Sequence, residues 1–157
     1  MRVILFRGKR TDNGEWIYGH LAALDMICPE YPEDTSNATG TYYGEIPYAG
    51  FVIVDPTTVG QYTELKDKNG KCIFDGDIVH YLYEPGKGYW NADQLSVIDF
   101  QGTGFHMNGI MGTNKYACMH GWLISIPYDQ DAENKPEFEV VGNIHDNPEL
   151  LKEADHA

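Results

Sequence analysis

The apolar and polar positions along the chain follow the two-residue period of short β-strands in several places. Residues 16–21 alternate between two faces, and residues 137–140 alternate with their apolar side chains on one side. Residues 51–54 form a continuous apolar run, which is typical of a buried strand, and residues 78–83 carry the strongest strand pattern. Further short strand-like segments occur at residues 3–6, 59–62, 95–101 and 105–107. The pattern predicts a mainly β protein, α+β at most.

Turn signals separate these strands. Asp12-Asn13-Gly14 stands between the first two segments, and Asn and Gly tolerate the positive φ that tight turns need. Residues 67–70, Asp-Lys-Asn-Gly, have the same chemistry between Leu65 and the apolar residues 72–74. Asp75-Gly76-Asp77 is a third turn, which leads into the strongest strand. We therefore expect an N-terminal β-hairpin and a second hairpin around residue 68.

Three segments depart from this strand-and-turn pattern. Residues 29–50 are rich in proline, acids and small polar residues, which indicates a long surface loop. In residues 108–126 the signals conflict and select no state. Residues 148–155 predict a short C-terminal helix, because Asn147 suits the N-cap, Pro148 the first helical position and Glu149 the positive end of the helix dipole.

Five short strands with Gly-rich turns between Asp77 and Ile144 favour a small SH3-like β-barrel in the C-terminal half. The N-terminal half contributes a β-hairpin region. With 157 residues the chain is long enough for one domain with a real core. We expect a single domain over residues 1–157, with sub-units at residues 1–62 and 63–157.

The charge of the chain limits its partners. There are 24 acidic against 11 basic residues, a net charge of -13, and no Lys or Arg lies between Thr11 and Leu65. Direct nucleic-acid binding is not expected, because such binding depends on cations that neutralise phosphates. The acids serve as solvated faces, or alternatively as a surface that binds a basic partner or mimics nucleic acid.

The sequence also bears on location. The apolar run at the N-terminus is too short for a signal peptide, and no run approaches the ~20 residues of a membrane span. The odd number of widely spaced cysteines, Cys28, Cys72 and Cys118, suits reduced thiols. We therefore expect a cytoplasmic protein without a membrane partner.

Metal-site patterns are weak. An EF-hand loop that starts at Asp67 would need an acid at Lys71 and a glycine at Cys72, so that pattern fails. Asp75 and Asp77 could contact a cation, but Asx turns that cap their own backbone are the favoured interpretation.

A zinc site would have to be assembled from dispersed residues, because the sequence has only one close ligand pair, Cys118 with His120. The candidate ligands are Cys118 with His120, His106, Cys28 and Cys72. The alternative is separate buried thiols and surface histidines. A Cys-His nucleophile pair has no local support.

Other enzyme signatures are incomplete. None of the three serines, Ser36, Ser96 and Ser125, lies in a G-x-S-x-G frame. Residues 84–88 resemble a phosphate-binding loop in their Gly and Lys content, but they lack the G-x-x-x-x-G-K-[ST] motif. We therefore assign no catalytic, cofactor-binding or metal residue and no cofactor.

Aromatic residues gather in two places. Trp16 shares a strand face with Tyr18, and a second set surrounds a loop, with members Tyr81, Tyr83, Tyr89 and Trp90. They serve in core and interface packing, or alternatively as a recognition surface.

Six segments, in order, resemble the YopX family of phage and prophage proteins. They are residues 6–9, 14–19, 55–63, 65–71, 74–79 and 139–151. Residues 24–49 and 102–136 carry no resemblance, and the loop at residues 29–50 is interpreted as an insertion. The resemblance implies a phage or prophage gene expressed in a bacterial cytoplasm. It implies no reaction and carries over no catalytic residue.

The sequence thus favours a non-enzymatic accessory protein that acts through protein–protein contact with a host or phage protein, or as a homo-oligomer. One alternative is an acidic inhibitor or nucleic-acid mimic of a host protein. Another is a small hydrolase that uses carboxylates or a metal.

Overall fold

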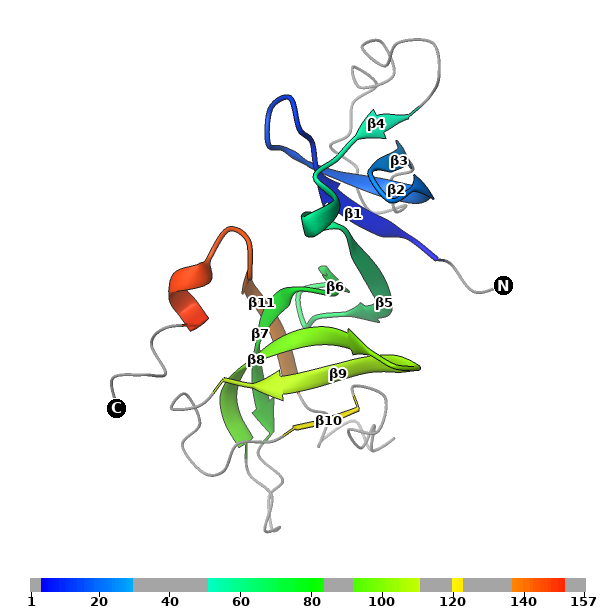
Figure 1. Ribbon diagram of the computed structural model, residues 1–157. Helices are drawn as coiled ribbons and strands as arrows, with labels where there is room; N and C mark the ends of the chain where they lie inside the picture. The colour runs from blue at the N-terminus through cyan, green and yellow to red at the C-terminus, as the bar shows by residue number, and fades with distance from the viewer. Residues whose placement is uncertain (1–3, 30–50, 84–91, 111–119, 123–136, 152–157) are drawn as a thin grey trace. The chain divides into compact units, whose positions relative to one another are not determined.

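The computed structural model describes residues 4–29, 51–83, 92–110, 120–122 and 137–151 (Figure 1). In these residues the chain is almost entirely β, arranged in two antiparallel sheets. The strands are β1 (Phe6–Lys9), β2 (Trp16–Ala23), β3 (Met26–Pro29), β4 (Val52–Ile53), β5 (Gly60–Lys66), β6 (Cys72–Phe74), β7 (Asp77–Tyr83), β8 (Ala92–Gln101), β9 (Gly104–Gly109), β10 (His120–Trp122) and β11 (Glu137–Asn143). Two short 3-10 turns, η2 (Pro56–Thr58) and η3 (Pro148–Leu151), complete the described elements.

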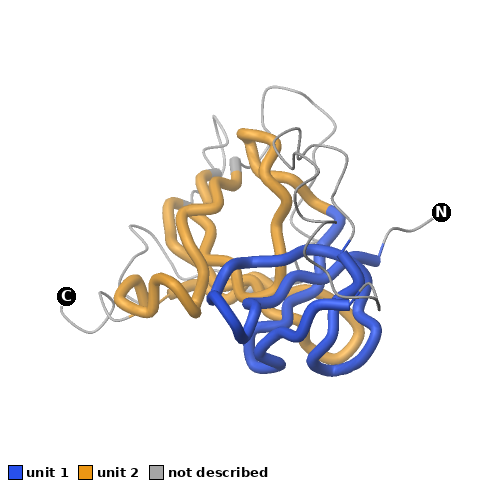
Figure 2. Tube along the Cα trace, turned by 90° about the horizontal axis from the view of Figure 1, so that it is seen from above, with its two compact units in different colours: residues 1–64 blue, residues 65–157 orange. Residues whose placement is uncertain are grey.

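The chain divides into two compact units, unit 1 with residues 1–64 and unit 2 with residues 65–157 (Figure 2). The first sheet has the order β4-β3-β2-β1-β5-β6, and β5 crosses the boundary between the units. The second sheet, β10-β9-β8-β7-β11, lies wholly in unit 2. Each unit has its own cluster of buried apolar side chains.

Unit 1 is built on the predicted N-terminal hairpin. β1 pairs with β2 with Lys9 opposite Trp16, and Gly14 takes a φ of 73° in the turn between them. Backbone hydrogen bonds from Thr11 to Ile53 and from Asp55 to Lys9 join the ends of β1 and β4. These strands share a small buried core of Ile17, Ile27, Val52 and Val54.

Gly8 lets β1 approach this core closely. A Cβ atom at this position would lie 3.0 Å from two side-chain atoms of Val54 and 3.2 Å from Ile27 Cδ1. Such contacts are too tight for a side chain without displacement of its neighbours. The glycine in the Phe-Arg-Gly-Lys segment is thus a packing requirement.

Unit 2 packs its core on one face of the second sheet. Alternation along β7 and β8 places Val79 and Tyr81 beside Ile98 in a buried cluster, and Ile73 from β6 joins them. The cluster is completed by Phe105 and Met107 with the half-buried Leu65, Phe138 and Val140. Tyr81 lies against Phe138, with ring centroids 5.1 Å apart.

The predicted SH3-like barrel is not confirmed. In the described residues the second sheet is open, with β10 and β11 as its terminal strands. Two backbone groups of β11 form hydrogen bonds with the turn that follows β5. Phe138 O accepts from Lys68 N at 2.9 Å, and Val140 N donates to Asp67 Oδ2 at 3.0 Å. The chain thus covers an edge of β11 with a turn.

The predicted C-terminal helix is wrong in its described part. Residues 148–151 form one 3-10 turn, in which Leu150 N donates to Asn147 O. Asn147 Oδ1 accepts from Asn143 N instead of capping a helix. The remainder of the predicted helix, residues 152–155, lies outside the described residues.

Other expectations shift at their edges. The first strand was expected at residues 3–6 and begins only at Phe6, while β3 (Met26–Pro29) was not predicted. The expected loop at residues 29–50 lies outside the described residues apart from Pro29, which ends β3. The apolar run at residues 51–54 is not buried throughout, because Phe51 and Ile53 are exposed. Of residues 108–126, the structure describes a strand end, Ile110 and β10.

None of the helices in the described part of the chain has the length and apolar character that a membrane span requires.

Glu64 is the only described non-glycine residue with positive φ, at 68°, and it lies within β5. The left-handed region costs an ordinary L-residue about 1–2 kcal/mol. We expect Glu64→Gly to stabilise the folded chain by up to about 1 kcal/mol. The free energy gained by relief of the backbone strain should exceed the cost of the larger conformational entropy that glycine gives the unfolded chain. Urea unfolding measures this change. Glu64→Ala tests the cause, because it removes the same carboxylate without relieving φ and should give no gain.

Candidate functional site

Asp67 lies at the centre of the turn between β5 and β6, where its side chain accepts backbone hydrogen bonds. It is 7% exposed, and its Oδ1 accepts from Asn69 N at 2.8 Å and Lys71 N at 2.9 Å. Its Oδ2 accepts from Val140 N on β11. The carboxylate therefore satisfies three backbone donors, which is an Asx-type structural role.

Asp75, Gly76 and Asp77 form the next turn. Gly76 has a φ of 83°, and Asp77 is 1% exposed, with Oδ2 accepting from Phe74 N at 2.8 Å. In the same turn, Gly76 O accepts a hydrogen bond from Ile144 N. Asp77 thus caps its own hairpin, in line with the simpler of the two sequence interpretations.

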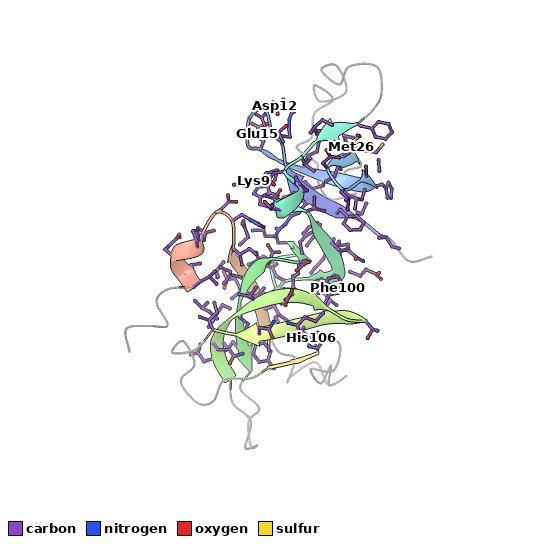
Figure 3. All side chains as sticks on the ribbon, in the orientation of Figure 1. Lys9, Asp12, Glu15, Met26, Phe100 and His106 are labelled. Atoms are coloured by element: carbon purple, nitrogen blue, oxygen red, sulfur yellow. The ribbon has the colours of Figure 1, made fainter. Side chains whose placement is uncertain are left out.

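The dispersed zinc candidates do not come together in the described residues, where no group of three His, Cys, Asp or Glu side chains is placed to hold a metal. Cys28 lies on β3 and Cys72 on β6, both half-buried. His106 on β9 is opposite Asp99 on β8 (Figure 3). The backbone of β10 places His120 opposite Asn108, and Cys118 lies outside the described residues.

The serine candidates are similarly placed by the fold. Ser96 is fully buried on β8 and accepts a hydrogen bond from Gln94 Nε2 at 2.9 Å. It is opposite Val79, so it shares the core face of the sheet. Ser36, Ser125 and the loop at residues 84–88 lie outside the described residues.

A hydrogen bond between His80 and Asp93 lies on the other face of the same sheet. His80 Nε2 lies 2.7 Å from Asp93 Oδ1, and both side chains are partly exposed. Such a pair can exchange a proton with a bound group. Ser96 cannot serve as its nucleophile, because consecutive strand residues point to opposite faces and Ser96 is on the Val79 side.

The aromatic candidates divide between core and cation contacts. Tyr81 is 1% exposed and belongs to the core of unit 2. Trp16 lies beneath two cations of its own chain, with Arg7 Cζ 4.7 Å and Lys9 Nζ 5.5 Å from the ring centroid. Tyr18 is half-buried on β2, Tyr83 ends β7, and Tyr89 and Trp90 lie outside the described residues. Tyr81 and Trp16 therefore make contacts within the chain.

The tip of the β1–β2 hairpin carries a compact charged group. Arg10 Nε donates to Asp12 Oδ1 at 2.8 Å, and Asn13 Nδ2 donates to Glu15 Oε2 at 2.9 Å (Figure 3). The hydrogen bond from Arg10 holds the pKa of Asp12 below its usual value. The exposed acid therefore stays ionised to lower pH than a free aspartate.

One surface was missed by sequence reasoning. Leu24 is 82% exposed in the turn before β3, and Ile53 and Phe51 are 46% and 44% exposed at β4. Met26 is half-buried directly opposite Ile53. These four residues are here called the β4 face. The sequence carries no signal for it, because residues 51–54 are all apolar and the alternation between exposed and buried side chains appears only in the structure.

Comparison with known proteins places the chain in a family. The family model described as YopX protein matches residues 5–152. The chain belongs to the YopX family. Among solved structures it is similar to protein EF1440 from Enterococcus faecalis, with 23% sequence identity, a TM-score of 0.48, and coverage of 96% of this chain and 99% of that chain. No curated protein matched it.

The segments that resemble YopX proteins have structural roles in this YopX-family chain. Gly8 allows close packing of β1, Asp67 and Asp77 cap turns, and Gly142 makes room for Asn147. The β4 face lies outside these segments. The matched motifs therefore explain the fold, whereas the β4 face is a separate surface feature.

Proposed function

We propose that this YopX-family protein is a phage- or prophage-encoded accessory protein that acts in the bacterial cytoplasm through protein–protein contact. The whole chain, residues 1–157, works as one domain. The observation that carries the proposal is the β4 face, where the exposed Phe51 and Ile53 lie beside Met26 and the exposed Leu24 stands in the adjoining turn. Contiguous exposed apolar side chains, rather than scattered ones, mark interaction surfaces.

The register of β3 and β4 makes this surface contiguous. Ile53 is opposite Met26, so their side chains share one face, while Ile27 and Val52 point into the core. Leu24 adjoins Met26 through the turn. Burial of these side chains by a partner would remove apolar area from water, which is the main favourable term in association.

A second function is favoured by charge. The net charge of -13 and the absence of Lys and Arg between Thr11 and Leu65 support an acidic inhibitor of a host nucleic-acid-binding protein. The two functions share protein–protein contact and differ in how strongly salt weakens it.

The test is affinity capture from bacterial lysate with the tagged full chain and a Phe51→Ser/Ile53→Thr variant. A Val141→Thr/Leu151→Ser variant removes two exposed apolar side chains of unit 2 and serves as the matched control. We expect a captured protein to be lost from the first variant and kept by the control. Equal capture by both variants would contradict the proposal, provided that their thermal unfolding matches that of the parent chain.

A further inference from the structure

We propose that the β4 face binds a basic amphipathic segment, one that presents apolar side chains flanked by Lys and Arg. This inference rests on the proposed function and names the chemistry of the partner. It is drawn from what surrounds the four apolar side chains, all within unit 1.

Three acidic residues adjoin the β4 face along the chain or through backbone hydrogen bonds. One of them, Asp12, is paired with Arg10, which forms a β-bridge with Val54 beside β4. Asp25 lies between Leu24 and Met26 in sequence, and its carbonyl accepts from Val54 N at 2.8 Å. Asp55 directly follows Val54 at the end of the strand. Asp12 follows Thr11, whose N–H donates to Ile53 O at 3.2 Å.

Cations are scarce around this surface. Residues 11–29 and 51–64 contain five acids and no Lys or Arg. The described cations of unit 1 lie on or just after β1, where Arg7 and Lys9 stack on Trp16 and Arg10 pairs with Asp12. Figure 3 shows Lys9 apart from Met26, with Asp12 and Glu15 at the hairpin tip.

Charge complementarity therefore selects the partner. An apolar centre with an acidic rim is matched by an apolar centre with a basic rim, because like charges at a rim repel and opposite charges speed association. A second copy of this chain fits poorly, since a two-fold contact would bring Asp25 and Asp55 of both copies to one interface. A basic amphipathic segment satisfies both the apolar area and the rim.

The probe is a fluorescein-labelled amphipathic peptide of about 15 leucine and lysine residues, titrated with the full chain and followed by fluorescence polarisation. Its matched partner has glutamate in place of every lysine. We expect the lysine peptide to bind at least about tenfold more tightly than the glutamate peptide at ~50 mM salt, and to weaken several-fold at ~500 mM salt.

Variants assign the binding to the β4 face. Phe51→Ser/Ile53→Thr should weaken the lysine peptide about tenfold or more, because each substitution removes apolar contact area. Asp25→Asn should reduce the salt dependence, whereas Glu149→Gln, the same charge change on unit 2, should leave it unchanged. Chromatographic mass of the free chain should be that of a monomer.

Three results would overturn the inference: equal binding of both peptides, binding that ignores the Phe51→Ser/Ile53→Thr substitutions, or a dimer that this variant dissociates. The last result would assign the face to a second copy. Loss of lysate capture in the same variant, with no peptide preference, would retain the proposed function and reject only the basic partner. Unchanged capture would reject the proposed function itself.

Discussion

Replacing Asp67 by alanine is expected to lower the free energy of unfolding by about 3–4 kcal/mol. Three backbone donors, Asn69 N, Lys71 N and Val140 N, lose their acceptor at a position that is 7% exposed. Hydrogen bonds to a charged group contribute about 1.5–3 kcal/mol each, and bonds that share one carboxylate are not additive. Val140 N is on β11, so the loss also loosens the turn from the second sheet.

Urea unfolding measures this effect as a lower midpoint at unchanged slope, with a fall in Tm of roughly 6–15 °C. Asp67→Asn keeps one acceptor oxygen and should cost about 1–2 kcal/mol. Lys68→Ala is the control in the same turn, because its partly exposed ion pair with Glu139 contributes less than about 1 kcal/mol. Equal effects of Asp67→Ala and Lys68→Ala would show that the Asp67 carboxylate does not hold the turn.

Gly142→Ala is expected to cost about 2–3 kcal/mol. A Cβ atom at this position would lie 2.5 Å from Asn147 Oδ1 and 2.8 Å from Asn147 Cγ. Asn147 Oδ1 accepts from Asn143 N, and Asn147 N donates to Asn143 O, so the side chain cannot retreat without breaking the turn. Overpacking of this kind typically costs about 1–3 kcal/mol.

A double-mutant cycle tests the cause directly. Asn147→Gly removes the three atoms nearest to the new Cβ, so Gly142→Ala in that background should cost less than about 1 kcal/mol. Chemical unfolding of the four proteins gives the coupling energy. Additive costs would mean that Gly142 is required for its backbone conformation and not for the space that Asn147 occupies.

Local sequence signals predicted the hairpins well, because the conformation of a tight turn depends on the types of neighbouring residues. Asp12-Asn13-Gly14 and residues 67–70 turn where expected, with Gly14 and Gly70 at positive φ. Strand β3 was not predicted, because the segment Met26–Pro29 ends in a proline and proline is typical of loops. Pro29 is tolerated because the strand has only four residues and ends there.

The candidate site could not be predicted, because it depends on which faces the fold leaves uncovered. Phe51 and Ile53 have the same apolar character as Val52 and Val54, yet only the latter pair is buried. The core of unit 1 covers one face of β4, and nothing in four consecutive apolar residues shows which face stays uncovered. Tyr81 belongs to the core, which agrees with core packing and not with the alternative of a recognition surface.

The sequence by itself determined the β class, the turns, the YopX family and the acidic character, because these depend on residue type and short-range order. Only the tertiary structure decided that Asp67 caps a turn against β11, that the second sheet is open in the described residues, and that Phe51 and Ile53 remain exposed beside Met26. These features join residues that are far apart in the chain. Long-range contacts and strand register determine these features, and neither can be predicted from a local sequence pattern.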